Sequence, residues 1–155
     1  TNLVNSPWMS ALYFQAARRL YDKHGDTLVL QQASNYFDWL DVNGFYDGSL
    51  AHPNMAGIVI PRYLTGELIG DAGYDEGNAD HALDVAGFVR FARRAKLVLN
   101  LPTNRVDARL AELANTTEWS FDNWTRTTTY LPKYRLSPPR KFNWWVRGAL
   151  ELIEN

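Results

Sequence analysis

The chain contains no cysteine, and this absence excludes several kinds of site. Disulfide bonds, thiolate metal centres and cysteine nucleophiles all need a thiol, so none of them can form within these 155 residues. The charge is nearly balanced, with 16 lysines and arginines against 17 aspartates and glutamates. A net charge of −1 gives no overall field that would attract nucleic acid or an anionic membrane. We therefore regard nucleic acid as an unfavoured partner.

Other familiar signals are missing as well. No apolar run approaches the ~20 residues of a membrane-spanning helix, so we expect no membrane partner. The three histidines are dispersed and lack the paired spacing of a zinc site. We find no phosphate-binding loop, dinucleotide fingerprint or nucleophile elbow. Aromatic residues are abundant instead, with 6 Trp, 8 Tyr and 7 Phe, and the length suits one domain with a substantial core.

Apolar periodicity predicts a first helical hairpin over residues 6–41. Ser6 and Pro7 mark the start of its first helix, Gly25 marks the end, and Asp26 is placed to cap the second helix. Two neighbouring rows at i, i+4 spacing are expected to face inward, with the charged residues largely outside them. The rows are Trp8, Leu12, Ala16, Leu20 and Met9, Tyr13, Ala17, Tyr21.

The pattern returns in a second hairpin over residues 81–117, in which Val106, Leu110 and Leu113 are expected to face inward. A basic aromatic segment follows over 118–141, and residues 142–153 predict a further helix. The loop 42–80 carries most of the glycines, yet its apolar residues favour an ordered functional loop over disorder. The fold class is therefore mainly α, built of antiparallel helical hairpins with a long ordered Gly-rich loop.

Two stretches resemble the (α/α) toroid carbohydrate-active proteins, which include glycoside hydrolases, polysaccharide lyases and sugar epimerases. The first is "PWMSALYFQAARRLYDKHGDTLVLQQASNYFDWL", and the second is "ADHALDVAGFVRFARRAKLVL". The resemblance implies a carbohydrate-processing or carbohydrate-binding role, a polysaccharide or oligosaccharide ligand, and an extracytoplasmic location. Six hairpins need more than 155 residues, so we expect a fragment or subunit that another chain or domain completes.

The acidic loop carries the candidate chemistry. Residues 63–89 contain no lysine or arginine, and "GDAGYDEGNADHALDVAG" holds five carboxylates. In sugar chemistry, Asp75 or Glu76 would pair with Asp84 as acid and base or nucleophile, or Tyr74 and His81 would transfer protons. These five residues are the predicted catalytic residues.

Three other interpretations of the loop stay open. Asp80 can cap a helix that begins near His81, with Asp84 in its first turn. A calcium-type cation could be held by the oxygen ligands of Asp71, Asp75, Asn78 and Asp80, although the spacing is not that of an EF-hand, and we expect no cofactor. Finally, the loop could pair electrostatically with the basic residues of 126–147.

The basic segment interleaves aromatic residues with arginines and lysines, as in "TYLPKYRLSPPRKFNWW". Stacking on sugar rings and gripping of anionic groups would make Arg140 and Trp144 substrate-binding residues. The competing interpretation places Phe142 and Trp145 in the core. The competing function for the whole chain is a non-catalytic structural or interaction subunit of a larger assembly.

Overall fold

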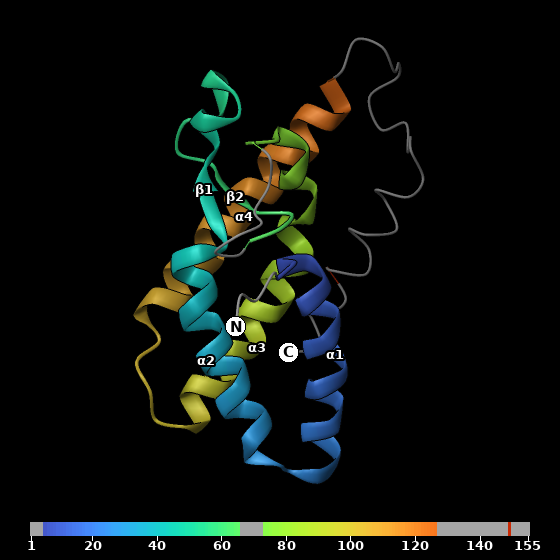
Figure 1. Cartoon of the computed structure of the whole chain (residues 1–155), viewed down its shortest axis with the longest axis vertical. Helices are drawn as coiled ribbons and strands as arrows, with labels where there is room; N and C mark the ends of the chain where they lie inside the picture. The colour runs from blue at the N-terminus through green and yellow to red at the C-terminus, as the bar shows by residue number, and fades with distance from the viewer. Residues whose placement is uncertain (1–4, 66–72, 127–148, 150–155) are drawn as a thin grey trace.

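The structure is a computed structural model that describes residues 5–65 and 73–126, together with residue 149 (Figure 1). It confirms that the protein is mainly α-helical. The described helices are α1 (Pro7–His24), α2 (Thr27–Asn43), α3 (Ala82–Val98) and α4 (Asn104–Arg126). None of them combines the length and apolar character needed to cross a bilayer. Most of the basic aromatic segment and of the predicted helix 142–153 lies outside the described residues.

The hairpin of α1 and α2 begins, turns and continues at the residues that the sequence predicts. Gly25 takes a left-handed φ of 71° and donates its N–H to the carbonyl of Tyr21, which ends α1. The carboxylate of Asp26 accepts from Leu28 N and caps α2. Ser6 stands at the cap position of α1, but its hydroxyl donates to the carbonyl of Tyr63 at 2.8 Å. The start of α1 is therefore tied to the chain that follows β2.

The prediction of which residues of α1 face the core is wrong in part. Ala17 is buried as predicted, whereas Met9, Tyr13 and Leu20 are more than half exposed. The buried positions are Pro7, Ala11, Phe14, Ala17 and Arg18. Apolar residues occur on nearly every side of this helix, so periodicity alone cannot identify the side that faces the core.

Helix α3 is the central element, because it packs against α1, α2 and α4 (Figure 1). Eleven of its 17 residues are buried, which explains an apolar character on almost all sides. Phe88 of α3 meets Phe14 of α1 and Tyr36 of α2, with ring centroids 4.6 Å and 5.1 Å away. Burial raises the pKa of Tyr36 to about 12, against the lowering effect of its hydrogen bonds to Ser10 and Asn5.

Residues 45–61 form a small arm beside the upper half of α4 (Figure 1). Strands β1 (Phe45–Asp47) and β2 (Val59–Pro61) pair antiparallel, with Tyr46 opposite Ile60. Two 3₁₀ turns, η1 (Gly48–Leu50) and η2 (Pro53–Met55), join the strands. Met55 and Ile60 form a second buried cluster with Tyr46 and Ala79.

Helix α4 continues well beyond the expected end at residue 117 because its later turns have partners. Thr116 is fully buried, and its hydroxyl donates to the carbonyl of Val59 at 2.7 Å. Ser120 is also buried, and Trp119 packs against the second cluster. The interior positions predicted earlier in α4 are confirmed for Val106 and Leu113, which are fully buried, while Leu110 packs partly buried on the core.

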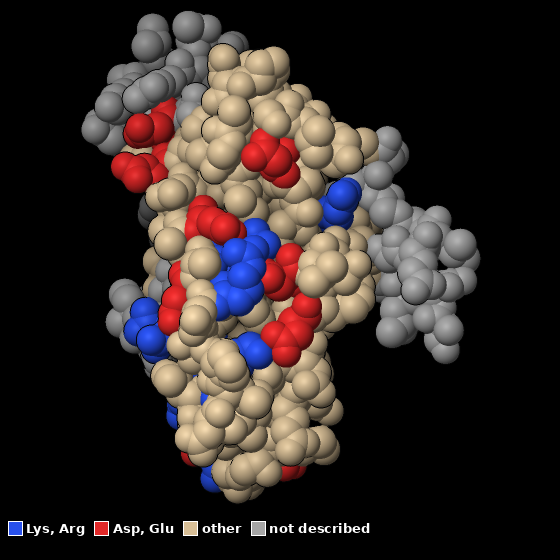
Figure 2. All heavy atoms as spheres, turned by 90° about the vertical axis from the view of Figure 1, so that its left-hand side faces the viewer, with Lys and Arg blue, Asp and Glu red and all other residues tan. Residues whose placement is uncertain are grey.

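Ion pairs join α2 to α4 and form a band of basic and acidic side chains across one face (Figure 2). Asp41 accepts from Arg105 Nε at 2.6 Å and from Arg109 Nε at 2.8 Å. Glu112 pairs with both arginines, and the guanidinium of Arg109 lies 4.0 Å from the centroid of the Phe45 ring. A single carboxylate at the end of α2 therefore holds two positions of α4.

The arm provides a first prediction, which concerns Gly48. A Cβ added at Gly48 would lie 2.7 Å from both Cβ and the carbonyl oxygen of Met55, and 3.0 Å from the carbonyl oxygen of Ile58. We expect Gly48→Ala to lower the free energy of unfolding by about 2 kcal/mol, because backbone atoms must move. Urea unfolding measures this change. Gly73→Ala is the matched control, since a Cβ there has no neighbour within 4 Å, and equal losses in the two variants would contradict the assignment.

Candidate functional site

Two predicted site residues meet where the chain enters α3. A 3₁₀ helix, η3 (Glu76–His81), leads directly into α3, and Asp84 lies in the first turn of α3 as expected. His81 Nδ1 lies 3.7 Å from Asp84 Oδ2, and both side chains are almost completely buried. A carboxylate that is hydrogen-bonded to an imidazole can orient the ring, but this separation is longer than a hydrogen bond. His81 and Asp84 are nevertheless of the residue types that proton-transfer sites use.

Two aromatic rings lie against the imidazole of His81. The indole of Trp8 stacks on the imidazole of His81, with centroids 5.1 Å apart and planes at 12°. Tyr63 leans against both rings, at 6.0 Å from Trp8 and 5.8 Å from His81, and its side chain is 43% exposed. We call Trp8, Tyr63, His81 and Asp84 the Trp8 cluster.

Backbone contacts bring the members of the Trp8 cluster together from distant parts of the chain. Asn5 and Thr65 form an antiparallel bridge, with N–H···O distances of 2.7 and 2.8 Å. The hydroxyl of Thr65 also donates to the carbonyl of Asn43 at the end of α2. Together with the bond from Ser6 to Tyr63, these contacts fix the chain after β2 against the start of α1.

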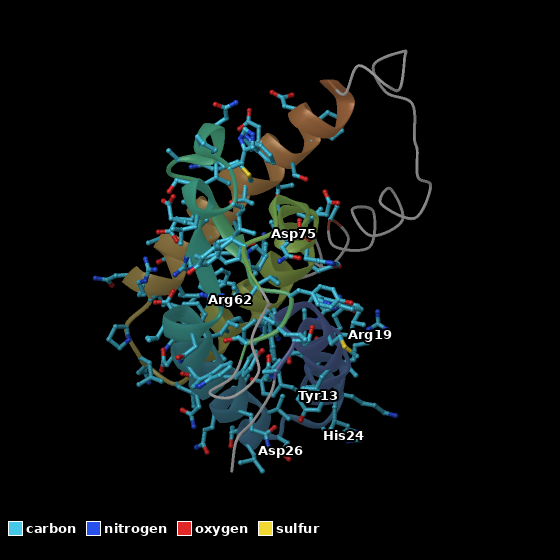
Figure 3. All side chains as sticks on the ribbon, turned by 45° about the horizontal axis from the view of Figure 1, so that its top comes forward. Tyr13, Arg19, His24, Asp26, Arg62 and Asp75 are labelled. Carbon is cyan, nitrogen blue, oxygen red and sulfur yellow. The ribbon has the colours of Figure 1, made fainter. Side chains whose placement is uncertain are left out.

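A second group of side chains, around the buried Tyr46, contains two further predicted residues. The ring of Tyr74 lies 5.0 Å from that of Tyr46, and the Arg62 guanidinium lies within 5.6 Å of both centroids. The Tyr46 hydroxyl donates to the carbonyl of Asp75 at 2.6 Å. We call Tyr46, Arg62, Tyr74 and Asp75 the Tyr74 cluster. Figure 3 shows Arg62 and Asp75 far from the α1–α2 turn, where His24 and Asp26 lie.

The structure thus places the predicted catalytic residues in two groups. His81 and Asp84 contact each other, whereas Tyr74 and Asp75 contact Tyr46. The Asp75 carboxylate is exposed and caps η3 by accepting from Gly77 N at 2.8 Å. Glu76 begins η3, and nothing further is described of its side chain. Arg140 and Trp144 lie outside the described residues.

The helix cap expected from Asp80 is wrong. The cap position of α3 is occupied by His81, whose side chain makes no capping hydrogen bond. Asp80 is buried and accepts instead from the hydroxyl of Ser120 on α4, at 2.8 Å. The capping carboxylate of this region is Asp75, at the start of η3.

The oxygen ligands proposed for a cation face different partners. Asp75 binds Gly77 N, Asp80 binds Ser120, and the amide of Asn78 reaches the Tyr46 hydroxyl at 3.4 Å. Asp71 lies outside the described residues. Within residues 5–65 and 73–126, no three histidine or acidic side chains gather in an arrangement that could hold a metal ion.

Sequence reasoning missed Tyr63 and Arg62, and it assigned Trp8 only to the core. The position of Trp8 in the first turn of α1 was one available signal. A residue at that position lies near any segment that packs on the start of the helix. Nothing local marks Tyr63, because its neighbours in the cluster come from α1 and η3. Comparisons with protein-family models, curated proteins and solved structures found no match.

Proposed function

We propose that the chain binds a polysaccharide across the Trp8 and Tyr74 clusters. It would do so as part of a carbohydrate-active protein of the (α/α) toroid type. The observation that carries this proposal is Tyr63, which is 43% exposed and whose ring lies against those of Trp8 and His81. An aromatic ring held in this way offers an apolar face to a sugar, while nearby polar groups hydrogen-bond its hydroxyls.

The Tyr74 cluster supports the same role. Tyr74 is 46% exposed, and Arg62 is held over its ring without a described carboxylate partner. A guanidinium in this position can donate two parallel hydrogen bonds to a sugar carboxylate or to hydroxyl groups. The proposed ligand would therefore contact one tyrosine in each cluster.

Of the two catalytic schemes, proton transfer has more support. The predicted scheme pairs Tyr74 with His81, but these two residues lie in different clusters. We therefore propose a version in which His81 would accept or donate the proton, with the Asp84 carboxylate near its imidazole. The scheme with paired carboxylates needs Asp75 or Glu76, and the Asp75 carboxylate already caps Gly77. Glycoside hydrolysis by a carboxylate pair is thus the less supported reaction.

Affinity electrophoresis through gels that contain neutral or uronate polysaccharides tests the binding role. We expect at least one polysaccharide to retard the protein, and Tyr63→Ala to weaken this binding about tenfold, which is about 1.4 kcal/mol. Tyr13→Ala is the matched control, because Tyr13 is similarly exposed but lies on the outer face of α1. No retardation by any polysaccharide, or equal weakening by both variants, would refute the proposal.

The same panel separates binding from catalysis. We expect His81→Ala to abolish release of reducing or unsaturated ends, and Asp75→Asn to leave it largely intact. A protein that binds but releases nothing is a binding module. The competing function, a non-catalytic interaction subunit, draws its support from the outer face of α1.

A further inference from the structure

Helix α1 carries a row of apolar side chains on the side that faces away from the core. Met9, Tyr13 and Leu20 are 56%, 57% and 51% exposed, and Ala16 between them is also exposed. At 100° per residue, these four positions fall within a sector of about 60°. We call Met9, Tyr13, Ala16 and Leu20 the outer row.

The spacing of the outer row is that of a helix–helix contact. Successive members are separated by four, three and four residues, which is the alternation that two packed helices share along their seam. A contiguous exposed apolar row of this kind marks an interaction site. The side chain of Tyr13 is held in place for such a contact, because its hydroxyl donates to Gln32 Oε1 on α2 at 3.3 Å.

Size complementarity indicates which helix fits the row. A two-fold axis between Tyr13 and Ala16 sets the largest side chain of the row against the smallest, twice. The same axis sets Met9 against the partner's Leu20. A parallel pair would instead oppose tyrosine to tyrosine and alanine to alanine, which leaves one contact crowded and the next empty.

The distribution of charge also favours an antiparallel pair of α1 helices. The exposed charged residues of α1 lie in its last two turns, namely Arg19, Asp22 and Lys23, and the first three turns have none. Asp22 is already paired with Arg94 of α3 at 2.7 Å. Parallel packing would bring the basic ends of two copies together, whereas antiparallel packing separates them and also opposes the two helix dipoles.

We infer that the outer row is the interface of a two-fold symmetric dimer, in which the α1 helices of two copies pack antiparallel. The interface is isologous, so each copy contributes the same four residues. Trp8 lies about 110° around α1 from the middle of the outer row, so the Trp8 cluster stays outside this interface. The dimer therefore does not depend on the proposed carbohydrate function.

Sedimentation velocity over a concentration series tests the dimer. We expect a species of twice the 17.7 kDa chain mass, and at least a tenfold loss of dimer affinity in Leu20→Glu. Leu50→Glu is the matched control, because Leu50 is 54% exposed on the arm. A monomer at every concentration, or equal effects of the two variants, would overturn the inference. Circular dichroism checks that both variants stay folded.

Cysteine cross-linking tests the orientation, since any introduced thiol is the only one in the chain. In the antiparallel dimer the two copies of residue 9 lie about 16 Å apart along the helix axis, beyond the reach of a disulfide. Met9→Cys mixed with Leu20→Cys should therefore form a cross-linked dimer on oxidation, and Met9→Cys alone should not. Efficient cross-linking of Met9→Cys alone would show a parallel pair and overturn the proposed geometry.

Discussion

Replacing Asp41 with alanine is expected to lower the free energy of unfolding by about 3 kcal/mol, the largest change that we predict. Asp41 Oδ1 and Oδ2 each accept from one arginine of α4, and its backbone carbonyl accepts from Arg109 Nη2 at 3.2 Å. The side chains of Arg109 and Asp41 are only 6% and 12% exposed. Removal of the carboxylate therefore leaves a buried guanidinium short of a partner.

Two further variants make this prediction specific. Asp22→Ala removes one member of an ion pair whose side chains are 37% and 40% exposed, so we expect a loss below ~1 kcal/mol. Asp41→Asn keeps one acceptor oxygen and should fall between wild type and Asp41→Ala. Chemical denaturation followed by tryptophan fluorescence measures all three. If Asp22→Ala and Asp41→Ala lose the same stability, the burial of the Asp41 pair contributes nothing.

Tyr36 gives the second large effect, which appears at alkaline pH. Its pKa is raised to about 12 in the folded protein, chiefly by burial, while an unfolded tyrosine ionises near 10. Between pH 10 and 12 the unfolded chain loses this proton and the folded chain keeps it. The free energy of unfolding therefore falls as the pH rises, by about 2.7 kcal/mol for two pKa units.

Tyr36→Phe isolates this contribution, because the other tyrosines titrate in both proteins. At pH 8 the variant lacks the hydrogen bond from Tyr36 to Asn5, so it should be about 1 kcal/mol less stable than wild type. At pH 12 the order should reverse. Wild type loses about 2.7 kcal/mol through the ionisation of Tyr36, which exceeds the ~1 kcal/mol by which it is more stable at pH 8. Urea unfolding at a series of pH values measures the difference, and a difference that stays constant would refute the assignment.

The helical part of the fold could be predicted because its signals are local. Pro7, Gly25 and Asp26 act within one turn of their own positions, so they locate the α1–α2 hairpin without knowledge of its partners. The inward face of α1 could not be predicted in the same way. Arg18 is buried although its side chain is charged, and no local pattern of α1 predicts this.

In the candidate site, too, the contacts between residues close in sequence could be predicted and the long-range contacts could not. His81 and Asp84 are three residues apart at a helix start, so their contact follows from helical geometry. Tyr63 reaches them only because the Asn5–Thr65 bridge and the Ser6 hydroxyl hold its segment against α1. Such long-range contacts depend on the whole fold. The same is true of Asp80, whose partner Ser120 lies on α4.

The central position of α3 has a consequence for how the protein unfolds. Each hairpin shares its apolar contacts with this one helix, so neither hairpin keeps a closed interior once α3 is displaced. Heat or denaturant should therefore melt the four helices in one transition, with calorimetric and van't Hoff enthalpies that agree. Limited proteolysis should accordingly yield no long-lived fragment that retains only one hairpin.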